Sequence, residues 1–148
     1  MRARNAATAL LLAGISVFTA GSAAQAFAPT PGSAGGENCS YRLVSVKTVR
    51  LQENRGDEVR IVIGGRIFPT TIPRNVKATV QGQVLNASAF GSPTEAFNGA
   101  ITVEMVEVDP LRNDRVGLRT ETCTPGVRTD IYEGSDARYD VTSEIIVG

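Results

Sequence analysis

The stretch EVRIVIGGRIFP, residues 58–69, indicates the fold class. Its first six residues place three β-branched side chains at every second position, while Glu58 and Arg60 point the other way, as in a half-buried β-strand. Gly64-Gly65 follows, and two consecutive glycines readily take the positive φ angles of a two-residue hairpin turn. Another short run, RIFP, begins directly after the turn. The stretch therefore predicts an antiparallel β-hairpin.

The same period of two recurs along the chain, and no window shows a sustained helical period. Turn-forming groups of Gly, Pro, Asn, Ser and Asp separate the strand-like runs. About eight short strands with hairpin connections predict an all-β fold, an antiparallel two-sheet β-sandwich, over residues 39–148. The other strand candidates are AITVEM (100–105), VGLRTE (116–121), YDVTSEIIV (139–147) and the ranges 41–52, 66–69, 76–80, 83–90 and 127–132.

The N-terminal segment has the layout of a secretory signal peptide. Two arginines precede a run of apolar and small residues, and two overlapping A-x-A sites end it, which predicts cleavage after Ala26 or Ala28. The apolar run over 6–20 is shorter than the roughly 20 residues of a transmembrane helix. We therefore expect a signal peptide over 1–28, a Pro/Gly/Ser-rich flexible leader over 29–38, and a secreted, extracellular protein from a bacterial source.

The chain holds two cysteines, Cys39 and Cys123, and both lie after the expected cleavage sites. An even cysteine count in an exported chain favours a disulfide. An internal bridge would join the start of the domain to a segment 84 positions later. The alternatives are two free thiols or a bridge between two chains.

The segment ITVEMVEVDP carries its alternation from apolar residues into acids. Met105 belongs to the apolar face, and Glu107 and Asp109 are the next two positions on that face. A carboxylate that faces the core is costly, so we expect the strand to leave the core there and to hold the two acids about 7 Å apart at Cα on the rim. Asp114 follows at the far end of the turn, just before the next strand.

Such a group of acids repels itself unless a cation or a basic side chain neutralises it. Calcium suits it, because this hard cation takes oxygen ligands from flexible loops. The alternative is an ordinary solvated turn. Asp-Pro and Asn-Asp are common turn formers, and Arg112 and Arg115 lie beside the acids in the sequence.

A second acidic turn, QENRGDEV, carries Glu53, Asp57 and Glu58. The step GDEVRIVI resembles the acidic loop that runs into a strand in C2 domains of the synaptotagmin type. VEVDPLRNDRVG resembles another loop of that family, with two acids one residue apart and a further acid three positions before a glycine. The resemblance implies an eight-stranded β-sandwich that binds calcium between rim loops. Its calcium ligands would be Asp57, Glu107, Asp109 and Asp114.

Several function classes are excluded or disfavoured. The chain has no histidine, so it lacks the Ser-His-Asp and Cys-His machinery and an imidazole ligand for zinc. Glu107 and Asp114 could serve a glycosidase, but the chain has no Trp for a sugar-stacking cleft. Cleavage removes Arg2 and Arg4 from the 15 basic residues, which leaves 13 against 15 acidic ones and does not favour nucleic acid.

The sequence therefore predicts a non-enzymatic binding module that depends on calcium through its rim loops. The alternative is a metal-free extracellular or envelope protein that binds its partner through a sheet face or an edge strand. The expected partner is a protein, a glycan or an envelope component. Membrane lipid is disfavoured, because Leu111 is the only apolar tip of the 106–117 loop.

Overall fold

The computed structural model describes residues 38–110 and 112–148. The expected signal peptide (1–28), the expected leader except for Asn38, and the loop tip Leu111 lie outside these residues. In the described part of the chain, no helix is long and apolar enough to cross a membrane.

Ten strands and one short 3-10 turn account for the regular structure of the described residues. In chain order they are β1 (Asn38–Arg50), β2 (Asp57–Ile63), β3 (Arg66–Phe68), β4 (Val76–Ala78), β5 (Val84–Asn86), η1 (Ala87–Phe90), β6 (Thr94–Asn98), β7 (Ala100–Val108), β8 (Asn113–Thr122), β9 (Gly126–Glu133) and β10 (Arg138–Val147).

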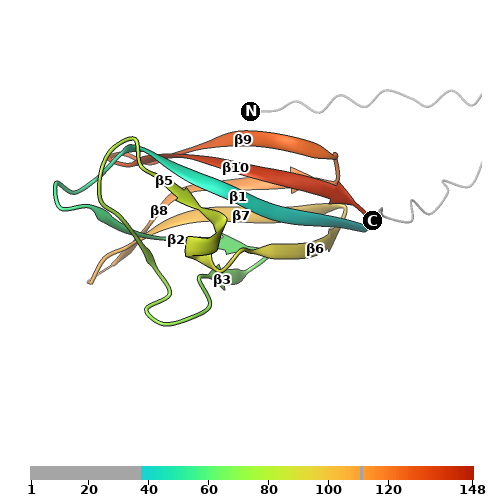
Figure 1. The fold of residues 1–148 in the computed structure, drawn as a ribbon, viewed down its shortest axis with the longest axis horizontal. Helices are drawn as coiled ribbons and strands as arrows, with labels where there is room; N and C mark the ends of the chain where they lie inside the picture. The colour runs from blue at the N-terminus through green and yellow to red at the C-terminus, as the bar shows by residue number, and fades with distance from the viewer. Residues whose placement is uncertain (1–37, 111) are drawn as a thin grey trace, which may run out of the picture. The chain divides into compact units, whose positions relative to one another are not determined.

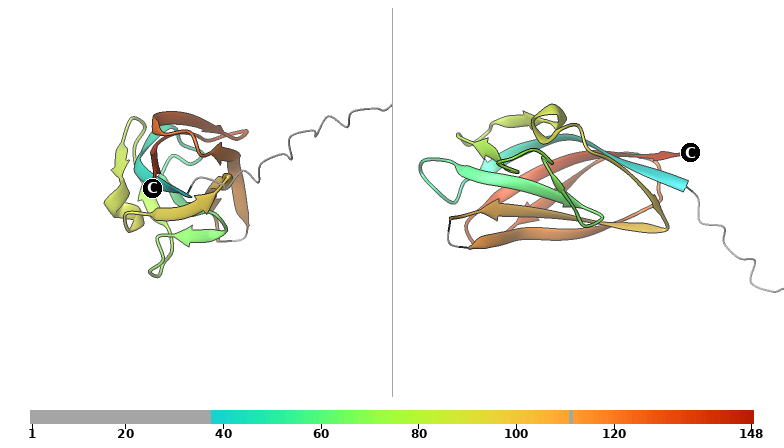
Figure 2. Two further views of the ribbon diagram at one scale, coloured as in Figure 1. Left: turned by 90° about the vertical axis from the view of Figure 1, so that its right-hand side faces the viewer. Right: turned by 90° about the horizontal axis from the view of Figure 1, so that it is seen from below.

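The strands form two five-stranded antiparallel sheets. Sheet A has the order β5-β1-β10-β9, and β6 also pairs with β1. Sheet B has the order β3-β2-β7-β8, and β4 also pairs with β2. Figures 1 and 2 show the two sheets face to face. The predicted fold class, an antiparallel two-sheet β-sandwich, is confirmed, with ten strands in place of about eight.

The alternation predicted from the sequence correctly identifies the side chains that form the core. Along β2 every second residue is buried, beginning with Asp57, and a similar pattern follows in β7 of the same sheet and in β10 of the facing sheet. The hairpin at Gly64-Gly65 is also confirmed, since both glycines have positive φ angles and Ile63 pairs with Arg66. The largest core side chains are Tyr41, Tyr132, Tyr139, Phe90, Leu43, Ile61, Ile63, Met105 and Ile145.

The strand expected over 83–90 is wrong in its second half. Only β5 is extended, and the chain then turns through η1, which buries Phe90 and ends at Gly91 with a φ of 81°. This turn lets the chain return to β1 further along, so that β5 pairs with one half of β1 and β6 with the other. Strand β6 was not predicted, because TEAFN alternates only weakly between apolar and polar residues, and its inward side chains are only partly buried.

The predicted internal disulfide is present. Cys39 of β1 and Cys123, just after β8, are bonded, and their Cα atoms lie 5.7 Å apart. Because β1 belongs to sheet A and β8 to sheet B, the bridge ties the two sheets together. The alternatives of free thiols and of an intermolecular bridge are thereby removed.

Candidate functional site

A cavity of about 330 Å³ opens at the end of the sandwich where β1 passes into β2, β7 into β8, and β9 into β10. In Figure 1 these turns lie at the end opposite to the C-terminus. Acidic and basic side chains dominate the lining, which comprises Gln52, Glu107, Arg112, Asp114, Arg115, Val116, Gly134, Ser135, Asp136 and Ala137.

Asp57, the first residue of β2, is buried with 1% of its surface exposed, and its charge acts on Glu107 of the cavity lining. Its carboxylate accepts hydrogen bonds from the backbone N–H of Gln52 (3.0 Å) and of Glu53 (2.9 Å). It also accepts one from the Tyr139 hydroxyl of β10, whose pKa is raised by burial and by this bond, so that the hydroxyl keeps its proton. Asp57 thus orders the β1–β2 loop and links the two sheets, which commits both of its oxygens.

Asp57→Asn should lower the free energy of unfolding by about 2 kcal/mol, because an amide NH₂ would face a part-buried backbone N–H that now has an acceptor. Tyr139→Phe removes one donor only and should cost about 1 kcal/mol. Urea unfolding at pH 7 measures both. If Asp57→Asn unfolds at the wild-type midpoint, the carboxylate does not hold the loop.

Glu107 differs from Asp57 in its partners. It lies on β7 opposite Val59 and Asp114, with 1% of its surface exposed. In the described structure neither of its carboxylate oxygens has a hydrogen-bond partner. Burial first, then the charges of Asp57 and Asp109, and then the approach of the Asp57 carboxylate, raise its pKa to about 8. The contact with Asp57 does not meet the geometry of a hydrogen bond, so we treat both oxygens as unpartnered. The prediction that the strand leaves the core at Glu107 is therefore wrong: the strand stays in the core there. The cost of burying this acid is reduced because the side chain keeps a proton at neutral pH.

Asp109 follows the end of β7 and faces a second hollow of about 330 Å³, which Glu53, Pro110 and Arg112 also line. Among the described residues, no ion pair or hydrogen bond joins the side chain of Asp109 or of Glu53 to a partner. Both carboxylates act on Glu107 and help to raise its pKa. Glu53 thus belongs to the acidic group, although the sequence analysis did not include it among the ligands.

The arginines of the 106–117 loop neutralise only part of this acidic group. Arg112 Nε lies 2.9 Å from Asp114 Oδ1, so Asp114 is paired within its own loop. Arg115 instead pairs with Glu104 Oε1 at 2.5 Å. Glu107 and Asp109 have no arginine partner in the part of the chain that the structure describes.

The four predicted calcium ligands are therefore not equivalent. Over residues 38–110 and 112–148, no three acidic or cysteine side chains are arranged to hold a metal ion. Asp57 is committed to three donors, and Asp114 to Arg112. Glu107 and Asp109 fit a cation, since the buried oxygens of Glu107 have no other partner and carboxylate is the donor that hard cations prefer.

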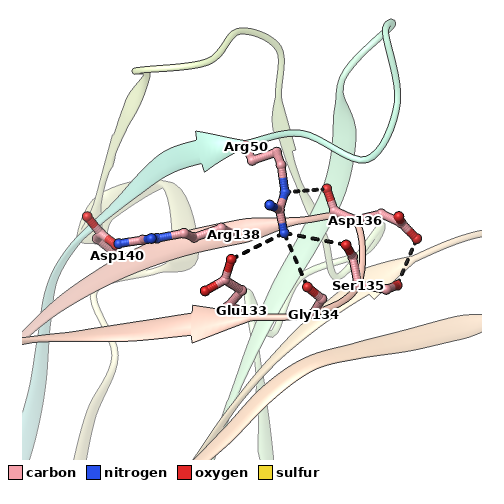
Figure 3. Close-up of polar contacts among 7 residues, drawn as sticks. All are labelled: Arg50, Glu133, Gly134, Ser135, Asp136, Arg138 and Asp140. Carbon is pink, nitrogen blue, oxygen red and sulfur yellow. Dashed lines mark hydrogen bonds and ion pairs between the residues drawn. The ribbon is translucent and has the colours of Figure 1, made fainter.

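Arg50, which carries no signal in the sequence pattern, binds the β9–β10 turn (Figure 3), and this turn lines the cavity. Its Nε donates to the carbonyl of Asp136 (3.0 Å), and its Nη2 reaches the carbonyls of Gly134 (3.3 Å) and Ser135 (3.5 Å). The same nitrogen lies 3.3 Å from Glu133 Oε1. Arg50 thereby fixes the β9–β10 turn against the end of β1. Its partners are mainly backbone carbonyls, which leave no side-chain signal in a sequence.

No protein-family model and no curated protein matches the chain. A solved structure described as a C2 domain is 9% identical, with a TM-score of 0.42 over 75% of this chain and 99% of that one. A C2 domain of plant extended synaptotagmin 1 is 8% identical, with a TM-score of 0.42 over 76% and 95%. A structure of two C2 domains of extended synaptotagmin 2 is 9% identical, with a TM-score of 0.45 over 90% of this chain and 47% of that longer chain. The structural neighbours are C2 domains at low sequence identity.

Proposed function

We propose that the chain is a non-enzymatic binding module that takes a cation at the Glu107 cavity, and that calcium is that cation. The observation that carries the proposal is the state of Glu107. A fully buried carboxyl group with two unpartnered oxygens lines a cavity beside two further acids. Buried polar groups are normally hydrogen-bonded, so an exception of this kind points to a missing partner.

The balance of charge supports the same proposal. Once Arg112 is assigned to Asp114 and Arg115 to Glu104, the unpaired charges beside Glu107 are mainly acidic. A bound cation would favour the ionised form of Glu107 and reduce its repulsion with Asp109. In this proposal Glu107 supplies ligand oxygens from its cavity, and Asp109 turns towards the ion from the neighbouring hollow, which shares Arg112 with that cavity. Asp57 keeps the β1–β2 loop in place.

Asp114 joins the ligand set only if Arg112 releases it. The Arg112 side chain is 84% exposed, and an ion pair at such a surface is weak. Arg112 is therefore a tethered cation that competes with the bound one. Removing it should strengthen cation binding by about two- to fivefold, the range that a surface ion pair of this kind can account for.

Calorimetric titration of the protein with calcium chloride tests the proposal. We expect a dissociation constant on the order of 10⁻⁴–10⁻³ M, as in extracellular calcium modules. Binding should be tighter at pH 8.5 than at pH 6.5, because Glu107 must lose its proton first. Two variants should abolish the heat of calcium binding: Glu107→Gln, and the double variant Asp109→Asn with Asp114→Asn. Glu58→Gln, which loses only its pairing with Lys77 away from the cavity, should retain the heat of binding, and Arg112→Gln should increase the affinity.

The absence of both heat and a thermal shift in millimolar calcium would overturn the cation proposal. The metal-free alternative would then be favoured, and the outer face of β9 would be the surface to test for a protein partner. There Val127 and Ile131 are exposed on an edge strand.

We also propose that the protein works outside the cytoplasm. The disulfide supports this, because structural disulfides persist in oxidising compartments. Fractionation of expressing cells, with N-terminal sequencing of the mature protein, tests export and the cleavage site.

A further inference from the structure

A third hollow, of about 300 Å³, lies away from the acidic group, beside the loop that joins β3 to β4. Arg66 of β3 lines it from one side, and Thr70 and Arg74 of the loop line it as well, together with Gly65 and Ile67. In Figures 1 and 2 the loop projects away from both sheets. The two guanidinium groups make this hollow basic, in contrast to the Glu107 cavity.

Arg66 is held in place by two contacts. Its Nη1 lies 2.6 Å from Glu95 Oε1, and its guanidinium carbon lies 5.6 Å from the centre of the Phe68 ring. Glu95 neutralises the charge of Arg66 but uses only part of a guanidinium group that has five N–H donors. The remaining donors are exposed at the hollow, since 64% of the side chain is accessible.

Arg74 has no such neutralising partner. Among the described residues, no ion pair or hydrogen bond engages its guanidinium group. Its backbone has a φ of 53°, a conformation that is uncommon for a residue other than glycine, and its N–H donates to the Thr71 carbonyl at 2.7 Å. Strained residues of this kind are concentrated at binding sites. The hollow thus combines one unpaired cation with a second that is already oriented.

We propose that Arg66, Arg74 and Thr70 form a binding site for a tetrahedral oxyanion, the phosphate or sulfate group of a larger ligand. The fork of N–H donors on arginine matches the oxygens of such a group and can bind two of them at once. The Thr70 hydroxyl supplies a further donor from the same loop. Because no acid of the Glu107 cavity contributes, this site is independent of the cation proposal.

Titration of the ¹⁵N-labelled protein with inorganic phosphate, in a chloride buffer of constant ionic strength, tests the site. We expect the arginine Nε–Hε signals of Arg66 and Arg74 to shift saturably, with a dissociation constant in the millimolar range. Arg74→Gln should weaken binding at least fivefold. Arg66→Lys, which keeps a charge for Glu95 but loses the fork, should also weaken it. Arg55→Gln, an exposed arginine in the β1–β2 loop, is the matched control and should bind as the wild type does.

Equal affinity in the wild type and in Arg74→Gln would overturn the proposal, and so would equal shifts with chloride alone.

A second experiment identifies the source of the oxyanion. Ile72 belongs to the same loop and is 89% exposed. If vesicles of an anionic phospholipid bind the protein, and both Arg74→Gln and Ile72→Ser abolish this binding, the oxyanion belongs to a lipid headgroup. If phosphate binds and vesicles do not, the ligand is a soluble phosphate or sulfate ester.

Discussion

Glu107→Gln is expected to flatten the pH dependence of stability and to make the protein more stable than the wild type at pH 8.5. The wild-type carboxyl group has its pKa raised from 4.5 to about 8 in the folded state, by burial first and then by Asp57 and Asp109. Between these two pH values the folded chain holds a proton that the unfolded chain has lost. Wild-type stability should therefore fall as the pH rises from about 4.5 to about 8, with a slope of up to about 1.4 kcal/mol per pH unit.

The sign follows from the direction of the shift. Below pH 4.5 the side chain is protonated in both states and contributes no slope. Above pH 8 it is ionised in both states, and the folded protein then carries a buried, unpartnered charge beside Asp57 and Asp109. Glutamine stays neutral throughout, so the variant avoids this penalty.

Urea unfolding at half-unit steps from pH 4 to pH 9, without calcium, measures the effect. Glu58→Gln is the matched control, because it lies on the neighbouring strand of the same sheet but pairs with Lys77 away from the Glu107 cavity. It should lose at most about 1 kcal/mol and keep the wild-type slope. Parallel curves for the wild type and Glu107→Gln would show that Glu107 is already ionised in the folded protein at neutral pH, and the account of its burial would then be wrong.

Removal of the disulfide should have the second large effect. Cys39→Ala with Cys123→Ala should lower the free energy of unfolding by about 4 kcal/mol, because the bridge closes a loop of 84 positions and restricts the unfolded chain. The effect should appear as slower folding or as a lower midpoint of urea unfolding. The packing of the folded protein should change little, since the sandwich keeps its hydrogen-bonded ladders.

Urea unfolding of the double variant and of the reduced wild-type protein measures the effect, and the two should agree within about 1 kcal/mol. A loss of less than about 1 kcal/mol in both would mean that contacts between β1 and its neighbours already restrict the unfolded chain.

Much of the fold could be predicted from the sequence, because strand alternation is a local property. In β2 and β7 each apolar residue that the pattern assigned to the inside is buried. The pattern was weakest where the chain changes direction over a few residues. Phe90 is apolar and follows β5, but it reaches the core from a 3-10 turn, and alternation alone does not distinguish the two routes.

The candidate site was predicted less completely. Period-two geometry correctly placed Glu107 on the face of Met105. The expectation that the strand leaves the core at Glu107 was wrong, since Glu107 is buried beside Asp57 and its pKa is raised. A sequence pattern shows on which face a residue lies, but not whether a distant loop covers it.

The all-β class and the hairpin at Gly64-Gly65 follow from the sequence by itself, since they depend on local periodicity and turn chemistry. The count of two cysteines favours a disulfide but leaves free thiols and a bridge between chains open, and the structure decided between them. Only the tertiary structure decided which acids are free. Asp57 is engaged by Tyr139, 82 positions away, and Asp114 by Arg112 within its own loop, while Glu107 is left without a partner. Whether a carboxylate is neutralised depends on which donors lie within about 3 Å of it, and chain folding sets that distance.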